Sequence, residues 1–272
     1  KHIEETYLHL PHYKGELYLE LHRGTLTNKQ QIKKNNRKSE VALHNLELLE
    51  TVQALQTGRA ASVEKTNHLW EILLKNQFHD ILPGSCIAVA HDQSIAETNS
   101  LLAAATEMTD QALLSYKDGT IFDAVFNPLG FEHKTPFEIP TDEMYTDPKG
   151  ELKTQQIVNL DNEKKLVVSG LSQKPFCRTP FHLKSGISTA DSPFLLDGNR
   201  LETAYASIRF DEDGYICSMI DKSNQRELCR GIPLGTFASA EDVPAKWDGW
   251  DIDADYELKL KAEKGNLISR EV

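Results

Sequence analysis

Residues 76–85 read NQFHDILPGS, which places a histidine beside an aspartate just before a Pro-Gly break. If the helical period of the preceding residues continues, Asp80 falls within about 40° of Leu69 and Leu73, on an apolar stripe. A carboxylate on a buried stripe is costly without a partner, and the dipole at a helix C-terminus adds to the cost. His79 and Asp80 therefore call for a compensating positive group, which a metal ion or a cationic partner would supply.

A more ordinary interpretation of the pair stays open. A histidine near a helix C-terminus is favoured by the dipole and can donate to the last carbonyls, and an aspartate can accept from loop amides. A zinc site needs three or four ligands, and no HExxH, HxH or HxxxH accompanies His79. If His79 binds a metal ion, we expect most of its co-ligands to lie outside these 272 residues.

Residues 245–257, AKWDGWDIDADYE, contain aspartates at alternate positions, as in a calcium loop. Tyr256 stands where an EF-hand requires glycine, so we reject that interpretation. Trp247 and Trp250 could stack on a sugar or pack in the core, and we favour the core. The spacing of His9 and His12 is weak evidence for a metal site, because Pro11 argues against a helix there.

The net charge of −11 disfavours nucleic acid and anionic membranes as partners. We interpret the basic run at residues 29–38 as a solvated helix face. The four cysteines form no CxxC pair, so we expect reduced thiols. No apolar stretch approaches the roughly 18 residues that a membrane span needs.

Helical periodicity predicts an antiparallel three-helix bundle over residues 28–117. Its first break is Thr57-Gly58, Ser62 is a candidate N-cap, and Pro83-Gly84 ends the second helix. Two apolar faces are predicted, one on the first helix and one on the third: Val41, Leu48, Val52 and Leu55; Leu101, Ala105, Met108 and Ala112.

Residues 118–272 read as short strands separated by Gly, Pro, Asn and Asp, which predicts a β-sandwich. Asp197-Gly198 and Asp213-Gly214 are expected hairpin turns, and so is Asp118-Gly119. Residues 1–27 fit neither part, because GELYLELHRGT predicts a short strand and then a turn at Gly24.

Several stretches, in order along the chain, resemble glycoside hydrolase family 38, the zinc-dependent α-mannosidases, in the version typical of bacterial and cytosolic-type members. The stretches are KGELYLELHRGTLT (14–27), LWEILLKNQFHDILPGS (69–85), VFNPLGF (125–131), LETAYASIRFDEDGYICSMIDKSNQREL (201–228) and EDVPAKWDGWDID (241–253). The resemblance implies an α+β multidomain architecture. Residues 1–27 would be the tail of an α/β catalytic barrel, 28–117 the bundle and 118–272 the start of the C-terminal β region.

The resemblance also implies residue roles. His79 would be one zinc ligand and Asp80 a sugar contact, with His22 and Arg23 as possible sugar contacts. The family's retaining chemistry needs two carboxylates, which would lie in a catalytic barrel upstream of Lys1. We therefore expect no catalytic residue in this chain, no hydrolysis by the chain alone, and a catalytic barrel as its partner in the same polypeptide.

The expected substrate is an α-mannoside of a glycan or a small mannosylated solute, and the expected location is a bacterial cytoplasm. The alternative is a non-catalytic carbohydrate-binding or scaffold module in which His79 and Asp80 only cap a helix.

Overall fold

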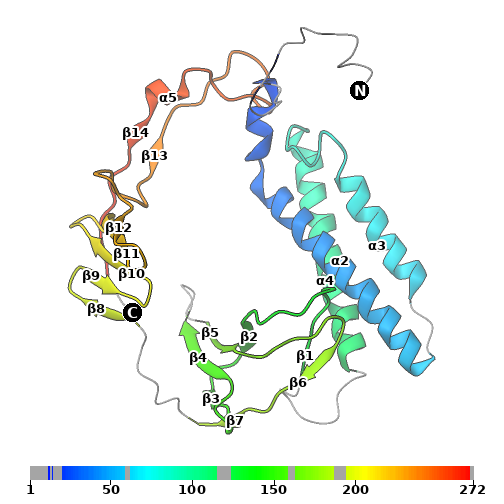
Figure 1. Ribbon diagram of the computed structural model, residues 1–272. Coiled ribbons are helices and arrows are strands. Elements are labelled where there is room, and N and C mark those ends of the chain that lie inside the picture. Colours follow the sequence, from blue (N-terminus) through cyan, green and yellow to red (C-terminus); the bar gives the residue numbers. More distant parts are fainter. Residues whose placement is uncertain are drawn as a thin grey trace.

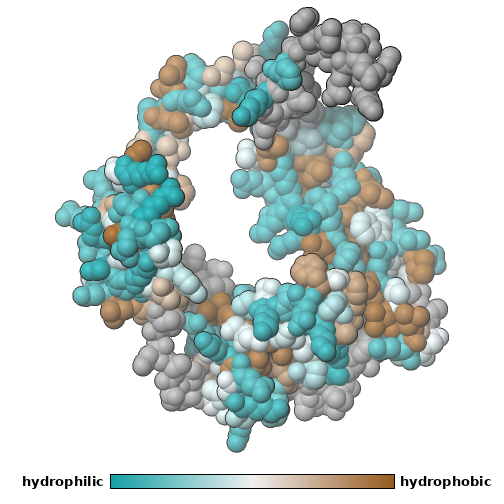
Figure 2. Space-filling model, viewed as in Figure 1, coloured by the Kyte–Doolittle hydropathy of each residue, from teal (hydrophilic) through white to brown (hydrophobic). Residues whose placement is uncertain are grey.

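A computed structural model describes residues 12, 14, 20–58, 62–114, 124–158, 163–186 and 194–269. The chain is α+β, with a helical part followed by several antiparallel sheets (Figure 1). Seen from the same side, the helices and two β parts surround a central opening (Figure 2). The helical elements are the 3-10 helix η1 (Glu20–Leu26) and helices α2 (Gln30–Thr57), α3 (Val63–Asn76), α4 (Ala88–Leu114) and α5 (Tyr256–Lys259).

Helices α2, α3 and α4 pack on one another around a shared apolar core. Its buried members are Leu43, Leu46, Leu69, Leu73, Leu101 and Ala105. The face predicted for α4 is confirmed, since Leu101, Ala105 and Ala112 are buried and Met108 packs against the core.

The face predicted for α2 is wrong, because Val41 and Leu55 are exposed. The buried stripe instead runs through Ile32, Asn35, Ser39, Leu43, Leu46 and Leu49, and so includes polar residues. Asn35 donates its amide to Thr98 Oγ1 and to Asn99 Oδ1, at 2.9 Å each. A buried amide is tolerated when its hydrogen bonds are made, so α2 meets α4 through a polar layer beside the leucine core.

The helix breaks were predicted with mixed success. Helix α2 ends at Thr57 as expected, with Gly58 in the left-handed conformation at φ 69°. Ser62 occupies the N-cap position of α3, although its hydroxyl makes no capping hydrogen bond. Helix α3 ends at Asn76, well before Pro83, so residues 77–84 form a turn instead of a last helical segment.

The strands pair only in antiparallel fashion within the described ranges. Five-stranded β12-β11-β10-β9-β8 and three-stranded β2-β5-β4 are the larger sheets, and β1-β6, β3-β7 and β13-β14 are pairs. The bounds are β1 Ala124–Phe126, β2 Phe137–Pro140, β3 Tyr145–Thr146, β4 Lys153–Val158, β5 Lys164–Ser169, β6 Arg178–Pro180, β7 Lys184–Ser185, β8 Leu195–Asp197, β9 Arg200–Glu202, β10 Ala206–Phe210, β11 Ile216–Asp221, β12 Arg226–Glu227, β13 Ala238–Ser239 and β14 Lys261–Ala262.

Two of the predicted hairpin turns are confirmed. Gly198 joins β8 to β9 and Gly214 lies between β10 and β11, both at positive φ, where glycine costs least. The three-stranded sheet buries Ile139, Leu166 and Val168. The turn expected at Asp118-Gly119 lies outside the described residues.

The segment before α2 differs from its expected strand and turn. Residues 20–26 form η1, in which the Thr25 hydroxyl donates to His22 O at 2.6 Å. Residues 15–19 of the expected strand lie outside the described residues. The C-terminal segment near residue 250 returns to this end of the helices (Figure 1), where Gly24 N donates to Trp250 O at 2.9 Å. None of the described helices has the length and apolarity required to cross a membrane.

Adjacent leucines on α3 test this packing. Leu73 is fully buried in the core, whereas Leu74 is 60% exposed. We expect Leu73→Ala to lower the free energy of unfolding by about 2–5 kcal/mol, because it leaves a cavity among the helices. Leu74→Ala is the matched control and should change it by no more than about 0.5 kcal/mol. Denaturant unfolding followed by circular dichroism measures both, and equal losses would contradict the packing.

Candidate functional site

His79 and Asp80 lie on the turn of residues 77–84 that follows α3, and both project toward solvent. Their side chains are 76% and 44% exposed, with His79 Nε2 at 3.7 Å from Asp80 Oδ2. The His79 ring packs at 4.2 Å, centroid to centroid, on the neighbouring ring of Phe78. The predicted place of Asp80 on a buried apolar stripe is therefore wrong, because α3 ends before that stripe reaches it.

Two amide side chains hold the end of α3 against both neighbouring helices. Gln77 Nε2 donates to Asn36 Oδ1 and Glu40 Oε1 on α2, each at 3.0 Å. Asn76 Nδ2 donates to Ile72 O at 2.8 Å and to Glu97 Oε2 on α4 at 2.9 Å. Asn76 and Gln77, which precede Phe78 and His79, are thus fixed on two sides.

Glu97 is the charged centre of the contact with α4. Its carboxylate accepts from Lys75 Nζ at 2.5 Å, from Asn76, and from Gln93 Nε2 at 2.9 Å. Hydrogen bonds from Lys75 and Asn76 lower the pKa of Glu97 to about 2. The Glu97 carboxylate is therefore ionised, and able to accept from Asn76, at any pH well above 2.

The second half of the turn is held through its backbone carbonyls. Lys33 Nζ donates to Asn28 O at 2.5 Å and to Leu82 O and Pro83 O at 3.1 Å each. An ammonium group with three carbonyl partners is satisfied without a carboxylate. Partial burial lowers the pKa of Lys33.

Gly84 closes the turn at φ 84°, a conformation that favours glycine. A Cβ at this position would lie 2.9 Å from the Cβ of Lys29, so no side chain fits. Gly84 O accepts from Asn28 Nδ2 at 2.9 Å and from His91 Nε2 at 3.1 Å. Because a carbonyl only accepts, Nε2 is the protonated nitrogen of His91.

His22 and Arg23 lie in η1 and contact the C-terminal segment. The His22 ring meets Trp250 edge-on at 5.1 Å, centroid to centroid, and its buried Nδ1 has no hydrogen-bond partner in the described part of the chain. Arg23 Nη2 donates to Ile252 O at 3.1 Å and lies 3.4 Å from Asp251 Oδ1. Contact of either residue with a sugar stays a prediction.

Among the described residues, no three His, Cys, Asp or Glu side chains are grouped to hold an ion, so His79 and Asp80 do not form a metal site by themselves. His79 on its exposed turn suits a ligand presented to a site completed by groups from elsewhere. Asp253 and Asp255 do not form a comparable donor pair, because both contact Lys259 Nζ, at 2.5 and 2.9 Å.

The favoured core position is wrong for one of the two tryptophans. Trp247 is 63% exposed and has φ 62°, whereas Trp250 is half-buried beside His22. Trp250 N and Asp251 N both donate to Trp247 O, at 2.7 and 2.9 Å, and so close a tight turn.

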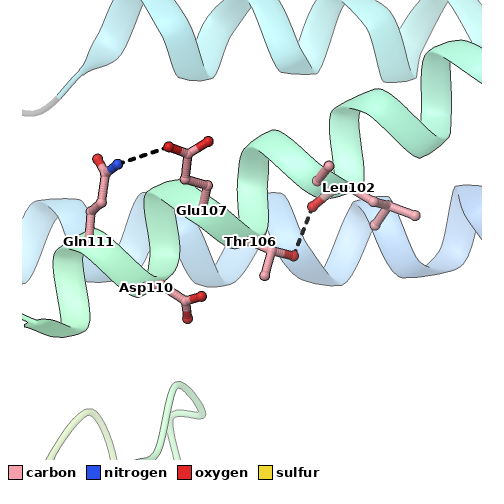
Figure 3. A pocket seen from close by; sticks show the side chains of 6 residues that line it. Leu102, Thr106, Glu107, Asp110 and Gln111 are labelled. Atoms are coloured by element: carbon pink, nitrogen blue, oxygen red, sulfur yellow. Dashed lines mark hydrogen bonds between the residues drawn. The ribbon is translucent and has the colours of Figure 1, made fainter.

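A depression runs along α4 (Figure 3). It is lined by Leu102, Ala103, Thr106, Glu107, Asp110 and Gln111. Within it, Gln111 Nε2 donates to Glu107 Oε1 at 3.2 Å and the Thr106 hydroxyl donates to Leu102 O at 2.8 Å. Because the Gln111 amide and the Thr106 hydroxyl already donate to groups of the same helix, this surface offers few polar groups for ligand binding.

Sequence reasoning missed the residues that hold the turn. Lys33 belongs to the basic run for which the charge pattern predicts a solvated face, and the sequence predicts a longer helix that includes Asn76 and Gln77. The sequence does contain one signal for an early helix end. An asparagine side chain such as that of Asn76 can bond to nearby backbone groups and so compete with helical hydrogen bonds.

Two family models match the chain. Residues 20–115 match the alpha mannosidase middle domain, and residues 201–271 match the glycosyl hydrolases family 38 C-terminal domain. The first includes η1 and the His79 turn, and the second includes Trp250 and Asp251.

Similar proteins carry related names. The chain is 30% identical over 256 residues to human "Alpha-mannosidase 2C1", covering 91% of the chain and 23% of that protein. It is 37% identical over 107 residues to "Alpha-mannosidase" of Saccharomyces cerevisiae, covering 38% of the chain and 10% of the relative. The crystal structure of an alpha-mannosidase from Enterococcus faecalis aligns with TM-score 0.55 at 14% identity, over 81% of this chain and 34% of that one, and so supports the fold. The chain spans about a quarter of the length of its human relative.

Acid titration tests the Glu97 contact. The folded-state pKa of about 2 lies below the ordinary value of 4.5, so Glu97 stabilises the fold above the ordinary value. That contribution is lost as the pH falls from about 5 to about 2. We expect the difference in unfolding free energy between the unmodified chain and Glu97→Gln to shrink over this window.

Glu71→Gln changes an exposed carboxylate on α3 and is the control. A Glu97→Gln difference that stayed constant from neutral pH to about pH 2 would show that the carboxylate does not hold the end of α3.

Proposed function

The chain belongs to the family 38 glycoside hydrolases, and we propose that it serves α-mannoside hydrolysis as the part of a longer polypeptide that presents one zinc ligand and one sugar contact. His79 is the proposed ligand and Asp80 the proposed sugar contact. The observation that carries the proposal is the placement of two exposed polar side chains on a turn whose backbone is held by α2 and α4.

A capping role explains the pair less well. A helix-capping histidine would donate to the last carbonyls of α3, but Gln77 N already donates to the carbonyls of Leu73 and Leu74. The carbonyls of Leu82 and Pro83 are taken by Lys33, and that of Gly84 by Asn28 and His91. The side chains of His79 and Asp80 are thus left available for a partner.

Each residue of the pair has a distinct proposed task. Neutral His79 offers a ring nitrogen lone pair to the ion, and ionised Asp80 accepts hydrogen bonds from sugar hydroxyls. A bound zinc ion would polarise sugar oxygens and stabilise developing charge. Because the turn is held at both ends, the chain's own contribution is to keep the imidazole and the carboxylate oriented together.

Retaining hydrolysis needs a carboxylate nucleophile and a carboxylic acid on opposite sides of the scissile bond. We propose that a catalytic barrel in the same polypeptide supplies both, with residues 1–27 as its tail, 28–117 as an antiparallel bundle and 118–272 opening a β-sandwich region. His22 and Arg23, next to that tail, are proposed as sugar contacts. The coverage of about a quarter of the human relative supports a longer polypeptide.

The proposed substrate is an α-mannoside of a glycan or a small mannosylated solute. The proposed location is a bacterial cytoplasm, which the free thiols of Cys86, Cys177, Cys217 and Cys229 support.

Replacement of the proposed ligand tests this function. In the complete enzyme, His79→Ala should strip the zinc and lower kcat/KM by at least about 100-fold, the upper end of what outer-shell changes cost. Metal content by atomic absorption and turnover of an aryl α-mannoside are the two measurements.

His68→Ala is the matched control, because His68 Nδ1 lies 3.7 Å from Glu71 Oε2, the same separation as in the His79–Asp80 pair. It should leave both zinc and activity unchanged. If His79→Ala kept full zinc and activity, the pair would only cap α3 and the chain would be a binding or scaffold module.

The second expectation is that the 272-residue chain alone turns over no aryl α-mannoside, because the nucleophile and the acid lie outside it. Turnover of an aryl α-mannoside by the purified chain would place the catalytic carboxylates within these residues and overturn this division of tasks.

A further inference from the structure

The C-terminal segment of residues 247–251, here called the clasp turn, packs directly on the turn that carries His79. A Cβ built on Gly249 would lie 3.4 Å from the Cα of Ser85, so a side chain at Gly249 would touch Ser85. Asn28 Nδ2 donates to Gly84 O at 2.9 Å and to Gly249 O at 3.2 Å. A single amide group therefore joins two turns that are far apart in the sequence.

The clasp turn is also fixed on its other side, by η1. Gly24 N donates to Trp250 O at 2.9 Å, and a Cβ on Gly24 would lie 2.6 Å from Asp251 O. Such a contact leaves no room for a methyl group. Arg23 adds its contacts with Asp251 and Ile252.

A short path of hydrogen bonds leads from the clasp turn to the candidate ligand. Ser85, which a side chain at Gly249 would touch, donates its backbone N to Asp80 O at 3.2 Å, and its hydroxyl lies 3.4 Å from the same oxygen. A shift of Gly84 and Ser85 would therefore change the backbone of Asp80 and, with it, the direction of the His79 ring.

We propose that Asn28 is a positioning residue through which the C-terminal β region sets the place of His79 and Asp80. This proposal rests on the proposed function for the role of His79. The two partners of Asn28 lie in the segments that match the middle domain and the C-terminal domain. Asn28 thus couples two domains at a polar contact outside the apolar core.

The central variant is Asn28→Asp, which keeps the side-chain shape but replaces the donating NH₂ with an oxygen facing two carbonyl oxygens. In the complete enzyme we expect the zinc dissociation constant, measured by competition with a chromophoric chelator, to rise on the order of 10-fold, as for other groups that orient a ligand. Hydrogen exchange at the amide of Ser85 should become faster.

Asn199→Asp is the matched control, because Asn199 Nδ2 donates to a single carbonyl, Phe210 O, at 3.1 Å in the β8–β9 region. It should leave the zinc dissociation constant and the exchange of Ser85 unchanged. If Asn28→Asp behaved like Asn199→Asp in both measurements, Asn28 would be an ordinary surface amide and the proposal would be overturned.

A second variant reaches the same contact from η1. Gly24→Ala should push the clasp turn away and weaken zinc binding without touching Asn28 or His79. Both substitutions break the same connection between the clasp turn and the His79 turn. The zinc dissociation constant of the double variant Gly24→Ala/Asn28→Asp should therefore rise no further than that of the more severe single variant. Fully additive effects would mean that the two sites act separately and would contradict the coupling.

His79→Ala separates failure of this proposal from failure of the proposed function. If His79→Ala removes zinc while Asn28→Asp changes nothing, only the positioning role is wrong. If His79→Ala leaves zinc bound, His79 is not a ligand and its positioning has no catalytic meaning, and both proposals fall.

Discussion

The turn of residues 77–84 carries an exposed imidazole and a half-exposed carboxylate, and hydrogen bonds to its backbone set its position. In this chain, donors from outside the turn take its last three carbonyls. Lys33 binds Leu82 O and Pro83 O, and Gly84 O accepts from Asn28 and His91. A neutral bond of this kind adds only about 0.5–1.5 kcal/mol and one from a charged group about 1.5–3 kcal/mol, but together they leave the turn few ways to move.

The rest of the helical part supports this arrangement. The leucine core fixes how α2, α3 and α4 lie against one another, and the amides of Asn76 and Gln77 carry that order to the end of α3. The 247–251 segment then brings the C-terminal region to the same place through Asn28. The helical part and the segment of residues 247–251 thus meet beside the turn proposed to serve the sugar and the ion, as expected where a site lies between domains.

The sequence predicted those features that apolar residues and glycine determine. The buried face of α4 follows from Leu101 and Ala105, and the breaks and hairpins follow from Gly58, Gly198 and Gly214. It failed where polar side chains take structural positions. Asn35 and Ser39 lie on the buried stripe of α2, so an apolar pattern selected the wrong face. Helix α3 ends at Asn76, where the side chains of Asn76 and Gln77 bond to α4 and α2, and Lys33 holds carbonyls from within a charged run. Such partners depend on tertiary structure and leave no periodic signal.

Anomalous diffraction at the zinc edge from crystals of the complete enzyme tests the central claim most directly, because it locates the ion itself. If His79 is a zinc ligand, we expect a peak about 2.0–2.1 Å from one of its ring nitrogens. A zinc peak whose ligands do not include His79, with the ring turned to solvent, would contradict it.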